Sequence, residues 1–277
     1  MSKMTSLQDL ASRIGDGQQL AIPCDFNGFY SGIAMEATRE LIRRGVRGLD
    51  VVAYPTTGIQ GDLLIGAGCV ASIQASSVFT GEHGVPPRFR AAFADHSIKV
   101  LEATCPAIHA AFQAGEKGIP FIPLRGIIGS DILNLRPDWK VIDNPFGNDD
   151  PIVVLPAITP DWALFHAPMA DRHGNVYIGR RHEMLTLAHA AKGTLVTFER
   201  LYEGNLTEDE GLAGGTIPDV YINAIALVPK GAWPHGFGSL YPEDAEHIEH
   251  YYSVASTREG FEQYMAEFVL NANEVVA

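Results

Sequence analysis

The sequence predicts an α/β fold: an open, largely parallel sheet with helices on both faces. Strand-like apolar runs alternate with helical patterns almost to the C-terminus, which is typical of parallel strands joined by crossover helices. No repeat, low-complexity tract or long linker interrupts this alternation. The chain has 277 residues, a length that one large domain can accommodate. We therefore expect a single domain over residues 1–277.

Capping residues and apolar residues at helical spacing mark the expected helices. Thr5 or Ser6 caps a first helix that stops at Gly15. Ser31 caps a second helix, which Gly45 closes, and its apolar residues share one face. Helical patterns cover residues 32–44, 106–115, 183–193, 243–254 and 257–270.

Short runs of apolar residues predict the strands. They cover residues 18–23, 49–54, 69–74, 98–101, 120–124, 151–156, 162–167, 193–198 and 221–229. A stretch rich in Pro, Asp and Asn at residues 136–151 is expected to be a surface excursion within the domain. Open parallel sheets bind ligands beyond the carboxyl ends of their strands, so we expect the functional residues in the loops that follow the strands.

The composition excludes several classes of protein. The formal net charge of −13 opposes binding to nucleic acid and to anionic membranes, and no run of 18 apolar residues predicts a membrane span. The N-terminus has the pattern of a capped helix and not of a signal peptide. Cys24, Cys69 and Cys105 form no CxxC pair. We therefore expect reduced cysteines and a cytoplasmic protein.

Three familiar motifs are incomplete or absent. The GAGCVA stretch at residues 66–71 fits GxGxxA, but a strand-like run follows it where a dinucleotide site needs a helix, so a tight turn is the favoured interpretation. His182 and His189 share a helix face without a third ligand, and no metal site is expected. HExxH and GxSxG are both absent, which disfavours zinc proteases and common serine hydrolases.

Two stretches could carry chemistry. Gly81 lies in a glycine- and proline-rich turn that leads to Arg88 and Arg90 at a helix start. These arginines could bind a phosphate or carboxylate, or they could form a solvated helix face. Glu102 ends a strand and precedes a helix. It could act as a nucleophile or general base, or it could only stabilise the helix N-terminus.

The stretch ADRHGNVYIGRR at residues 170–181 joins turn-type residues to a strand-like run. Taken alone, this chemistry predicts a turn. Its residues also belong to a wider set of segments that resemble the alpha (A) subunit of family I coenzyme A transferases, especially the glutaconate CoA-transferase-like branch. These segments, in order, are DGQQLAI (16–22), DLLIGAGCVASI (62–73), GVPPRFRAAF (84–93), GIPFIPLRGIIGSDIL (118–133) and HAPMADRHGNV (166–176).

The resemblance implies a CoA-transferase-like fold and a CoA thioester as substrate, with no permanently bound cofactor. Two-chain members carry the catalytic glutamate on the beta subunit, in a Ser-Glu-Asn-Gly-type motif. This chain has only Tyr-Glu-Gly-Asn at residues 202–205. The resemblance therefore implies an alpha subunit that needs a beta subunit, as a heterodimer or heterotetramer, and that acts on an acyl-CoA and a carboxylic acid.

The substrate-binding residues implied by this resemblance include one departure from the family pattern. After the DGxxLAI segment the family has a Gly-Gly-Phe-like loop, where this chain has Pro23, Cys24, Asp25 and Phe26. Proline removes a backbone N–H and aspartate adds negative charge, so the family's way of binding substrate at this loop is in question. We expect the remaining contacts with substrate from Gly81, Arg88, Arg90, Arg125 and Arg172.

A branch of the same family, the ring-opening CoA-thioester hydrolases of steroid breakdown, uses a glutamate on the alpha chain. The matching segment here points to Glu102. Three hypotheses follow: the alpha subunit of a CoA-transferase, a thioester hydrolase that cleaves a carbon–carbon ring bond with Glu102 as base, and a non-catalytic partner or ligand-binding subunit. Fold alone does not decide among them.

Overall fold

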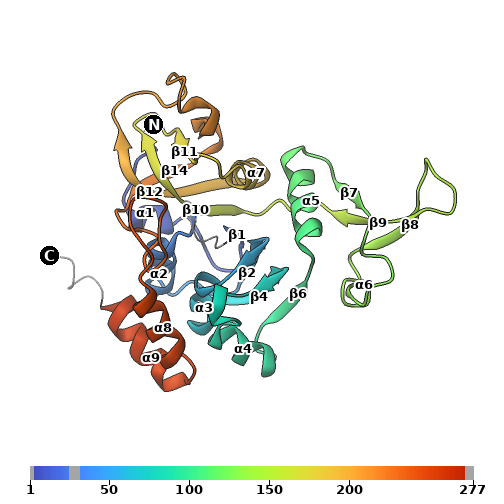
Figure 1. The fold of residues 1–277 in the computed structure, drawn as a ribbon, viewed down its shortest axis with the longest axis horizontal. Helices are drawn as coiled ribbons and strands as arrows, with labels where there is room; N and C mark the ends of the chain where they lie inside the picture. Colours follow the sequence, from blue (N-terminus) through green and yellow to red (C-terminus); the bar gives the residue numbers. More distant parts are fainter. Residues whose placement is uncertain (1–2, 25–31, 272–277) are drawn as a thin grey trace.

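A largely parallel sheet forms the centre of the computed structural model, which describes residues 3–24 and 32–271 (Figure 1). Its parallel strands, from one edge to the other, run β6-β4-β2-β1-β10-β12-β14. Short antiparallel strands extend it beside the end of β10. The strands are β1 Gln19–Pro23, β2 Leu49–Tyr54, β4 Val70–Ala75, β6 Lys99–Glu102, β10 Trp162–Asp171, β11 Val176–Tyr177, β12 Gly193–Tyr202, β13 Thr216–Ile217 and β14 Ala224–Leu227.

Helices cover both faces of this sheet, as the sequence predicts. Leu20 and Ile22 of β1 join the apolar cluster of the first helix layer, whereas Ala21 joins the cluster of the second, because successive strand residues point to opposite faces. The first layer comprises α1 Leu7–Ala11, α2 Met35–Arg43, α3 Ile59–Gly66, α4 Pro87–Ala94, α8 Ala245–Val254, α9 Arg258–Met265 and the π-helical turn η4 Ala266–Leu270. The second comprises α5 Cys105–Glu116 and α7 Glu183–Ala190.

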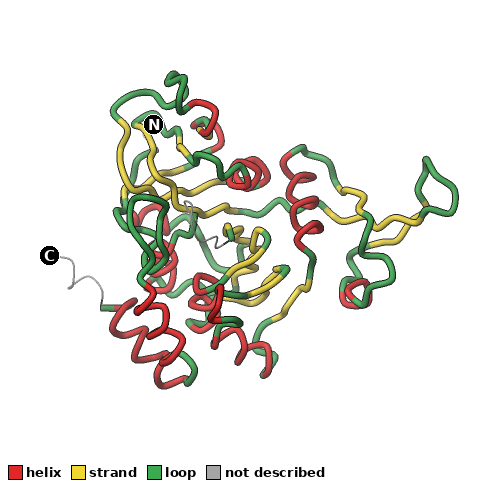
Figure 2. Tube along the Cα trace, viewed as in Figure 1, coloured by secondary structure: helices red, strands yellow, loops and turns green. Residues whose placement is uncertain are grey.

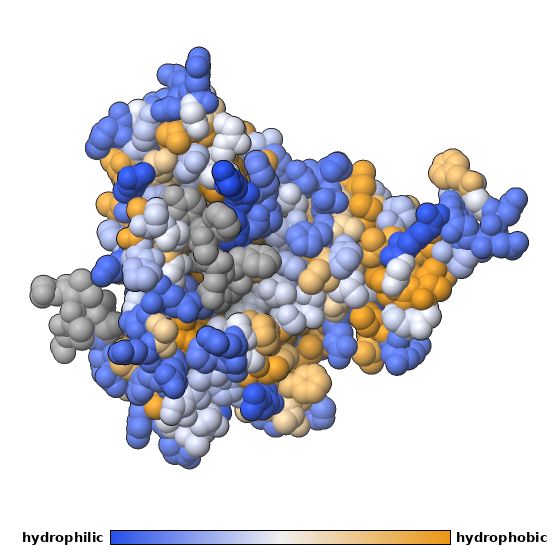
Figure 3. Space-filling view, in the orientation of Figure 1, coloured by the Kyte–Doolittle hydropathy of each residue, from blue (hydrophilic) through white to orange (hydrophobic). Residues whose placement is uncertain are grey.

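A second, antiparallel sheet projects from the body as an arm over residues 119–157 (Figures 1 and 2). It contains β7 Phe121–Leu124, β8 Lys140–Asp143 and β9 Pro151–Pro156, paired in the order β7-β9-β8, with the short helix α6 Ile132–Leu135. Apolar side chains such as Phe121, Leu135 and Phe146 are exposed on the arm (Figure 3). The alternation pattern did not separate these strands from the central sheet. The link between β8 and β9, residues 144–150, is too short for a parallel crossover.

Two local details differ from the sequence expectations, and a third agrees with them. The first helix ends at Ala11, before Gly15. The second begins at Met35, because Gly32 adopts a φ of +77° and Ala34 is not helical; its expected cap Ser31 lies outside the described residues. The GAGCVA stretch is a helix end, a turn and a strand, the reverse of a dinucleotide fingerprint.

The remaining elements are short. A two-stranded pair, β3 Thr56–Thr57 and β5 Ser77–Val78, follows the ends of β2 and β4. Three 3₁₀ turns complete the described structure: η1 Gly81–His83, η2 Ala213–Gly215 and η3 Asp219–Tyr221. Among the helices described, none has the length and apolar character that crossing a bilayer requires.

The ADRHGN stretch is a turn built around one buried carboxylate. Oδ1 of Asp171 accepts hydrogen bonds from the backbone N–H groups of His173, Gly174 and Asn175, at 2.9, 3.0 and 3.0 Å. Its Oδ2 accepts from the Asn175 amide and from the Leu206 N–H, at 2.8 and 2.9 Å. Asp171 therefore joins the end of β10 to a loop that lies 35 residues further along the chain.

We predict that Asp171→Ala lowers the free energy of unfolding by about 3 kcal/mol or more, because it leaves several buried N–H groups without an acceptor. Chemical denaturation monitored by circular dichroism measures this. Asp95→Ala is the matched control: Asp95 accepts the Ser97 N–H in an exposed turn, where water can replace the carboxylate. Equal effects of the two changes would contradict the role assigned to Asp171.

A second buried carboxylate, Asp62 of α3, joins three helices of the first layer. It accepts hydrogen bonds from the N–H groups of Arg88 and Phe89 at the start of α4 and from the Tyr251 hydroxyl of α8. Burial raises the pKa of Asp62 to about 6, although the hydrogen bond from Tyr251 opposes this rise. The folded chain therefore retains a proton that the unfolded chain releases at lower pH.

We predict that the contribution of Asp62 to the free energy of unfolding falls as the pH rises from about 4 to about 6. Asp62 has a folded pKa of about 6 against an ordinary 3.8, so the folded state binds more protons in this window, and the difference corresponds to about 3 kcal/mol. The difference in free energy of unfolding between the wild type and Asp62→Asn, measured by denaturation at a series of pH values, should show this slope. An unchanged slope in the variant would contradict the prediction.

Candidate active site

The carboxyl ends of the parallel strands meet at one edge of the central sheet. Cys24 follows β1, Tyr54 ends β2, Ser76 follows β4 and Glu102 ends β6. Their neighbouring strands are in parallel register, with Pro23 opposite Tyr54 and Ala75 opposite Glu102. This edge is where open α/β sheets bind their ligands.

Glu102 is exposed at the end of the outermost strand, β6. Among the described residues, no hydrogen bond or ion pair involves its carboxylate. Its backbone carbonyl accepts a hydrogen bond from Nη1 of Arg136 at 3.0 Å. Two residues later, the Thr104 hydroxyl caps α5 by accepting from the Ala107 N–H. The helix cap expected as an alternative role of Glu102 is therefore supplied by Thr104.

A thiol lies beside Glu102. Cys105 is exposed at the first turn of α5, and its Sγ lies 3.1 Å from Oγ of Ser76. His109 is one helical turn further along α5 and half-buried. Strand β4 and helix α5 thus bring polar side chains to the same part of the edge as Glu102.

His109 also belongs to a polar cluster between α5 and α7. Its ring lies 4.5 Å from the ring of Tyr54, which packs at 4.7 Å against Phe112. Burial lowers the pKa of His109, while the charge of Glu183 opposes this change. Burial also raises the pKa of Tyr54 to about 12. A neutral imidazole beside a carboxylate can accept or donate a proton near neutral pH.

Arg181 connects this cluster to the loop after β1. Its guanidinium forms an ion pair with Glu183 and lies 3.8 Å from Sγ of Cys24. Pro23 and Cys24 are both buried. Asp25 and Phe26, also expected to bind substrate, lie outside the described residues. Arg181 therefore links Cys24, after β1, to Glu183 at the start of α7.

The arginines expected to bind substrate lie on different elements. Arg88 is buried, donates to the Ser256 carbonyl at 2.9 Å and stacks on the ring of Phe261, so a contact with substrate would require it to leave these partners. Arg90 is exposed on α4 and donates to the Val85 carbonyl.

Arg125, in the arm, forms an ion pair with Asp150. The pKa of Asp150 is lowered by a hydrogen bond from Asn144 and, to a smaller extent, by the contact with Arg125. Arg172 is exposed in the β10–β11 turn, 3.7 Å from Glu203. Gly81 begins η1 with a φ of +42°. The structure thus groups Glu102 with Cys105 and Arg136, and it distributes the other four arginines over α4, the arm and the turn after β10.

Sequence reasoning missed Tyr54, His109, Glu183 and Arg136. Tyr54 ends a predicted strand, and His109 follows Cys105 at helical spacing, so both positions carried a weak signal in the sequence. His182 and His189, near Glu183, entered only as metal-ligand candidates. Within the described ranges, no three His, Cys, Asp or Glu side chains gather as a metal site would require.

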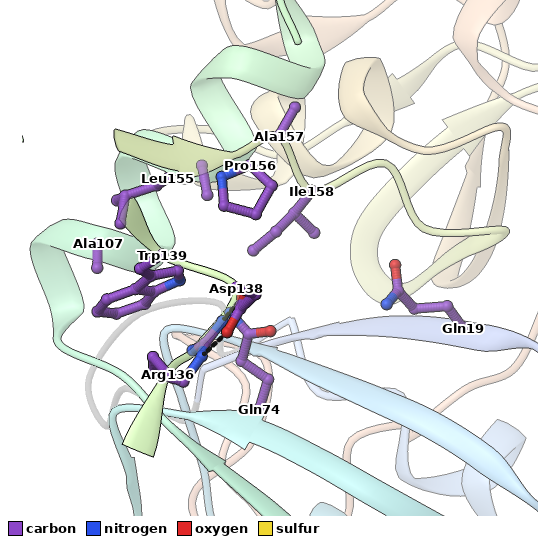
Figure 4. A pocket seen from close by; sticks show the side chains of 11 residues that line it. Gln19, Gln74, Ala107, Arg136, Asp138, Trp139, Leu155, Pro156, Ala157 and Ile158 are labelled. Atoms are coloured by element: carbon purple, nitrogen blue, oxygen red, sulfur yellow. Dashed lines mark hydrogen bonds and ion pairs between the residues drawn. The ribbon is translucent and has the colours of Figure 1, made fainter. Parts of the chain in front are cut away.

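A pocket of about 180 Å³ lies between α5, the root of the arm and the sheet (Figure 4). Gln19 and Gln74 reach it from the sheet, Arg136 and Asp138 from the arm, and Ala107 from α5. Its wall includes Trp139, so it is bounded by both polar and apolar groups. Arg136 lines this pocket and also donates to the backbone carbonyl of Glu102 at the end of β6.

Comparison with curated proteins gives relatives over nearly the whole chain. An uncharacterized protein of Archaeoglobus fulgidus is 31% identical over 98% of this chain, which spans 60% of that relative's length. The alpha (A) subunit of glutaconate CoA-transferase from Acidaminococcus fermentans is 29% identical over 99% of this chain and 90% of its own. The cholesterol ring-cleaving hydrolase IpdA subunit of Rhodococcus jostii is 27% identical over 98% of this chain and 93% of its own.

The fold also matches a solved structure. The crystal structure of glutaconate coenzyme A-transferase from Acidaminococcus fermentans aligns with a TM-score of 0.88 and 26% identity, over 100% of this chain and 93% of that one. Residues 4–227 match the coenzyme A transferase family. The CoA-transferase-like fold and the family resemblance expected from the sequence are therefore confirmed, and this chain belongs to the coenzyme A transferase family.

Proposed function

We propose that this chain is the alpha-type subunit of a heteromeric CoA-transferase that moves CoA between carboxylic acids. One observation carries the proposal: the chain matches the alpha (A) subunit of glutaconate CoA-transferase almost from end to end, in sequence and in fold. The partner is a beta subunit of the same family, in a heterodimer or heterotetramer. It supplies the glutamate that attacks the CoA thioester. The complex works in the cytoplasm, in keeping with cysteines that form no disulfide in the described part of the chain.

In this proposal the chain's own residues bind and orient the two substrates at the carboxyl edge of the sheet. Glu102, Cys105 and Ser76 line one part of that edge, and the Tyr54–His109 cluster lines another. Arg90, Arg125 and Arg172 are the exposed cations proposed to contact the carboxylate or phosphate groups of the substrates. The CoA thioester is a substrate, and the proposal includes no permanently bound cofactor.

A second candidate function is a CoA-thioester hydrolase that opens a carbon–carbon ring bond with Glu102 as general base. The position of Glu102 favours it: the carboxylate is exposed at the strand end and has no partner among the described residues. The similarity to an IpdA subunit supports the same hypothesis. The two functions differ in which chain carries the essential carboxylate.

We predict that the chain transfers CoA only when it is assembled with a beta-type chain of the same family. Acetyl-CoA with glutaconate and other short dicarboxylates tests transfer, and hydroxylamine or borohydride traps any glutamyl-CoA thioester for mass spectrometry. The adduct should map to the partner, because this chain lacks the family's nucleophile motif. A monomer that is active alone, or an adduct on this chain, would contradict the transferase proposal, and a complex without turnover would favour a non-catalytic binding role.

We predict that Glu102→Gln separates the two candidate functions. Loss of a general base typically lowers the rate by ~10²–10⁴-fold. Such a collapse of CoA-ester hydrolysis, with binding of the ester retained, is expected for the hydrolase. Appreciable transfer by the same variant is expected for the transferase. Glu259→Gln, on the exposed first turn of α9, is the matched control and should behave as wild type.

A further inference from the structure

Arg136 links the arm to the end of strand β6. It follows α6 at the root of the arm, and its side chain is only 3% exposed. Figure 4 shows it at the pocket with Asp138 and Trp139. Burying a guanidinium is costly unless its donors are all directed at acceptors, so its partners define what it does.

Most of the guanidinium is fixed by residues of its own segment. Nε and Nη2 donate to the two carboxylate oxygens of Asp138, at 2.9 and 2.7 Å. This two-point contact is the leading cause of the lowered pKa of Asp138. The guanidinium carbon lies 4.2 Å above the ring of Trp139. Asp138 and the Trp139 ring together fix the plane of the guanidinium. Its third nitrogen, Nη1, therefore has one fixed direction.

This third nitrogen, Nη1, donates to the backbone carbonyl of Glu102 at 3.0 Å. The other side of the same peptide group is also held, because the Ala103 N–H donates to the Ala75 carbonyl at 3.3 Å. Both polar groups of the peptide that follows Glu102 are therefore bound, one by the arm and one by strand β4. This fixes the direction of the peptide plane at the point where an edge strand ends, and with it the direction in which the Glu102 side chain leaves the backbone.

We propose that Arg136 is a positioning residue that aims the Glu102 carboxylate into the active site, and that the arm thereby controls the geometry of the site. The inference rests on the second candidate function, in which Glu102 is the general base that acts on a CoA thioester. Arg136 acts through the backbone of Glu102 and does not need to touch the substrate. A displacement of about 1 Å in a catalytic group can cost ~10²-fold in rate without weakening binding.

The test compares Arg136→Gln with the wild type in the assembled complex. With the CoA ester that the wild type turns over, kcat should fall by ~10–100-fold while KM changes by less than about twofold. Arg136→Lys, which keeps one donor near the Glu102 carbonyl but loses the planar fork, should recover part of the loss. Arg258→Gln is the matched control: Arg258 forms an exposed ion pair with Glu262 on α9, and its loss should leave kcat unchanged.

A double-mutant cycle with Glu102→Gln separates positioning from a merely structural role. If Arg136 acts through Glu102, then Arg136→Gln should have almost no further effect on kcat once Glu102→Gln is present. Losses that multiply would overturn the inference. Should Arg136→Gln fail to assemble, Arg136→Lys takes its place in the same cycle.

The outcomes also separate this inference from the proposed function. A wild-type complex that turns over no CoA ester disproves both candidate functions and the positioning role together. An active wild type in which Glu102→Gln has no effect removes Glu102 from the chemistry and overturns the role of Arg136. An active, Glu102-dependent complex whose kcat does not change in Arg136→Gln overturns the positioning role alone.

Discussion

The parallel hydrogen-bond ladder from β10 through β1, β2 and β4 to β6 is the constraint on which the rest of the structure depends. Parallel neighbours cannot be joined by tight turns, so each connection must cross the sheet, and the crossing segments bury both of its faces. The same geometry brings every carboxyl end to one edge. Glu102, Ser76 and Tyr54, which are far apart in sequence, are neighbours there because of strand direction alone.

This constraint explains how much of the fold could be predicted from the sequence. Strands buried on both faces are continuous apolar runs, and crossover helices have apolar stripes, so the central sheet and most of its helices were predicted. Helix α3 was missed because residues 59–65 are buried all round and have no polar face to reveal a helical period. The sequence could not show that β7 and β9 belong to a separate sheet, because a strand pattern identifies a strand but not its partner.

The residues of the candidate site could also be predicted only in part. Glu102 could be predicted as a candidate because it ends a strand and precedes a helix. Open α/β sheets bind their ligands at such strand ends. Arg136 could not be predicted, because it contacts a backbone carbonyl 34 residues away. Every residue has a backbone carbonyl, so the residue types do not show which one an arginine contacts. Arg88 was a candidate by charge, but its burial against Phe261 depends on helices near the C-terminus. The roles of the exposed arginines remain predictions.

Strand β6 has a further consequence for the behaviour of the protein in concentrated solution. In the described part of the chain it pairs with β4 alone, so its outer side presents backbone donors and acceptors that another molecule's strand could bind. The strand is only four residues long, and its first and last residues, Lys99 and Glu102, are exposed charges. A short, charged edge resists sheet-to-sheet association between molecules. Glu102, the candidate general base, thus also places a charge on an exposed strand edge, where it helps to keep the protein from aggregating.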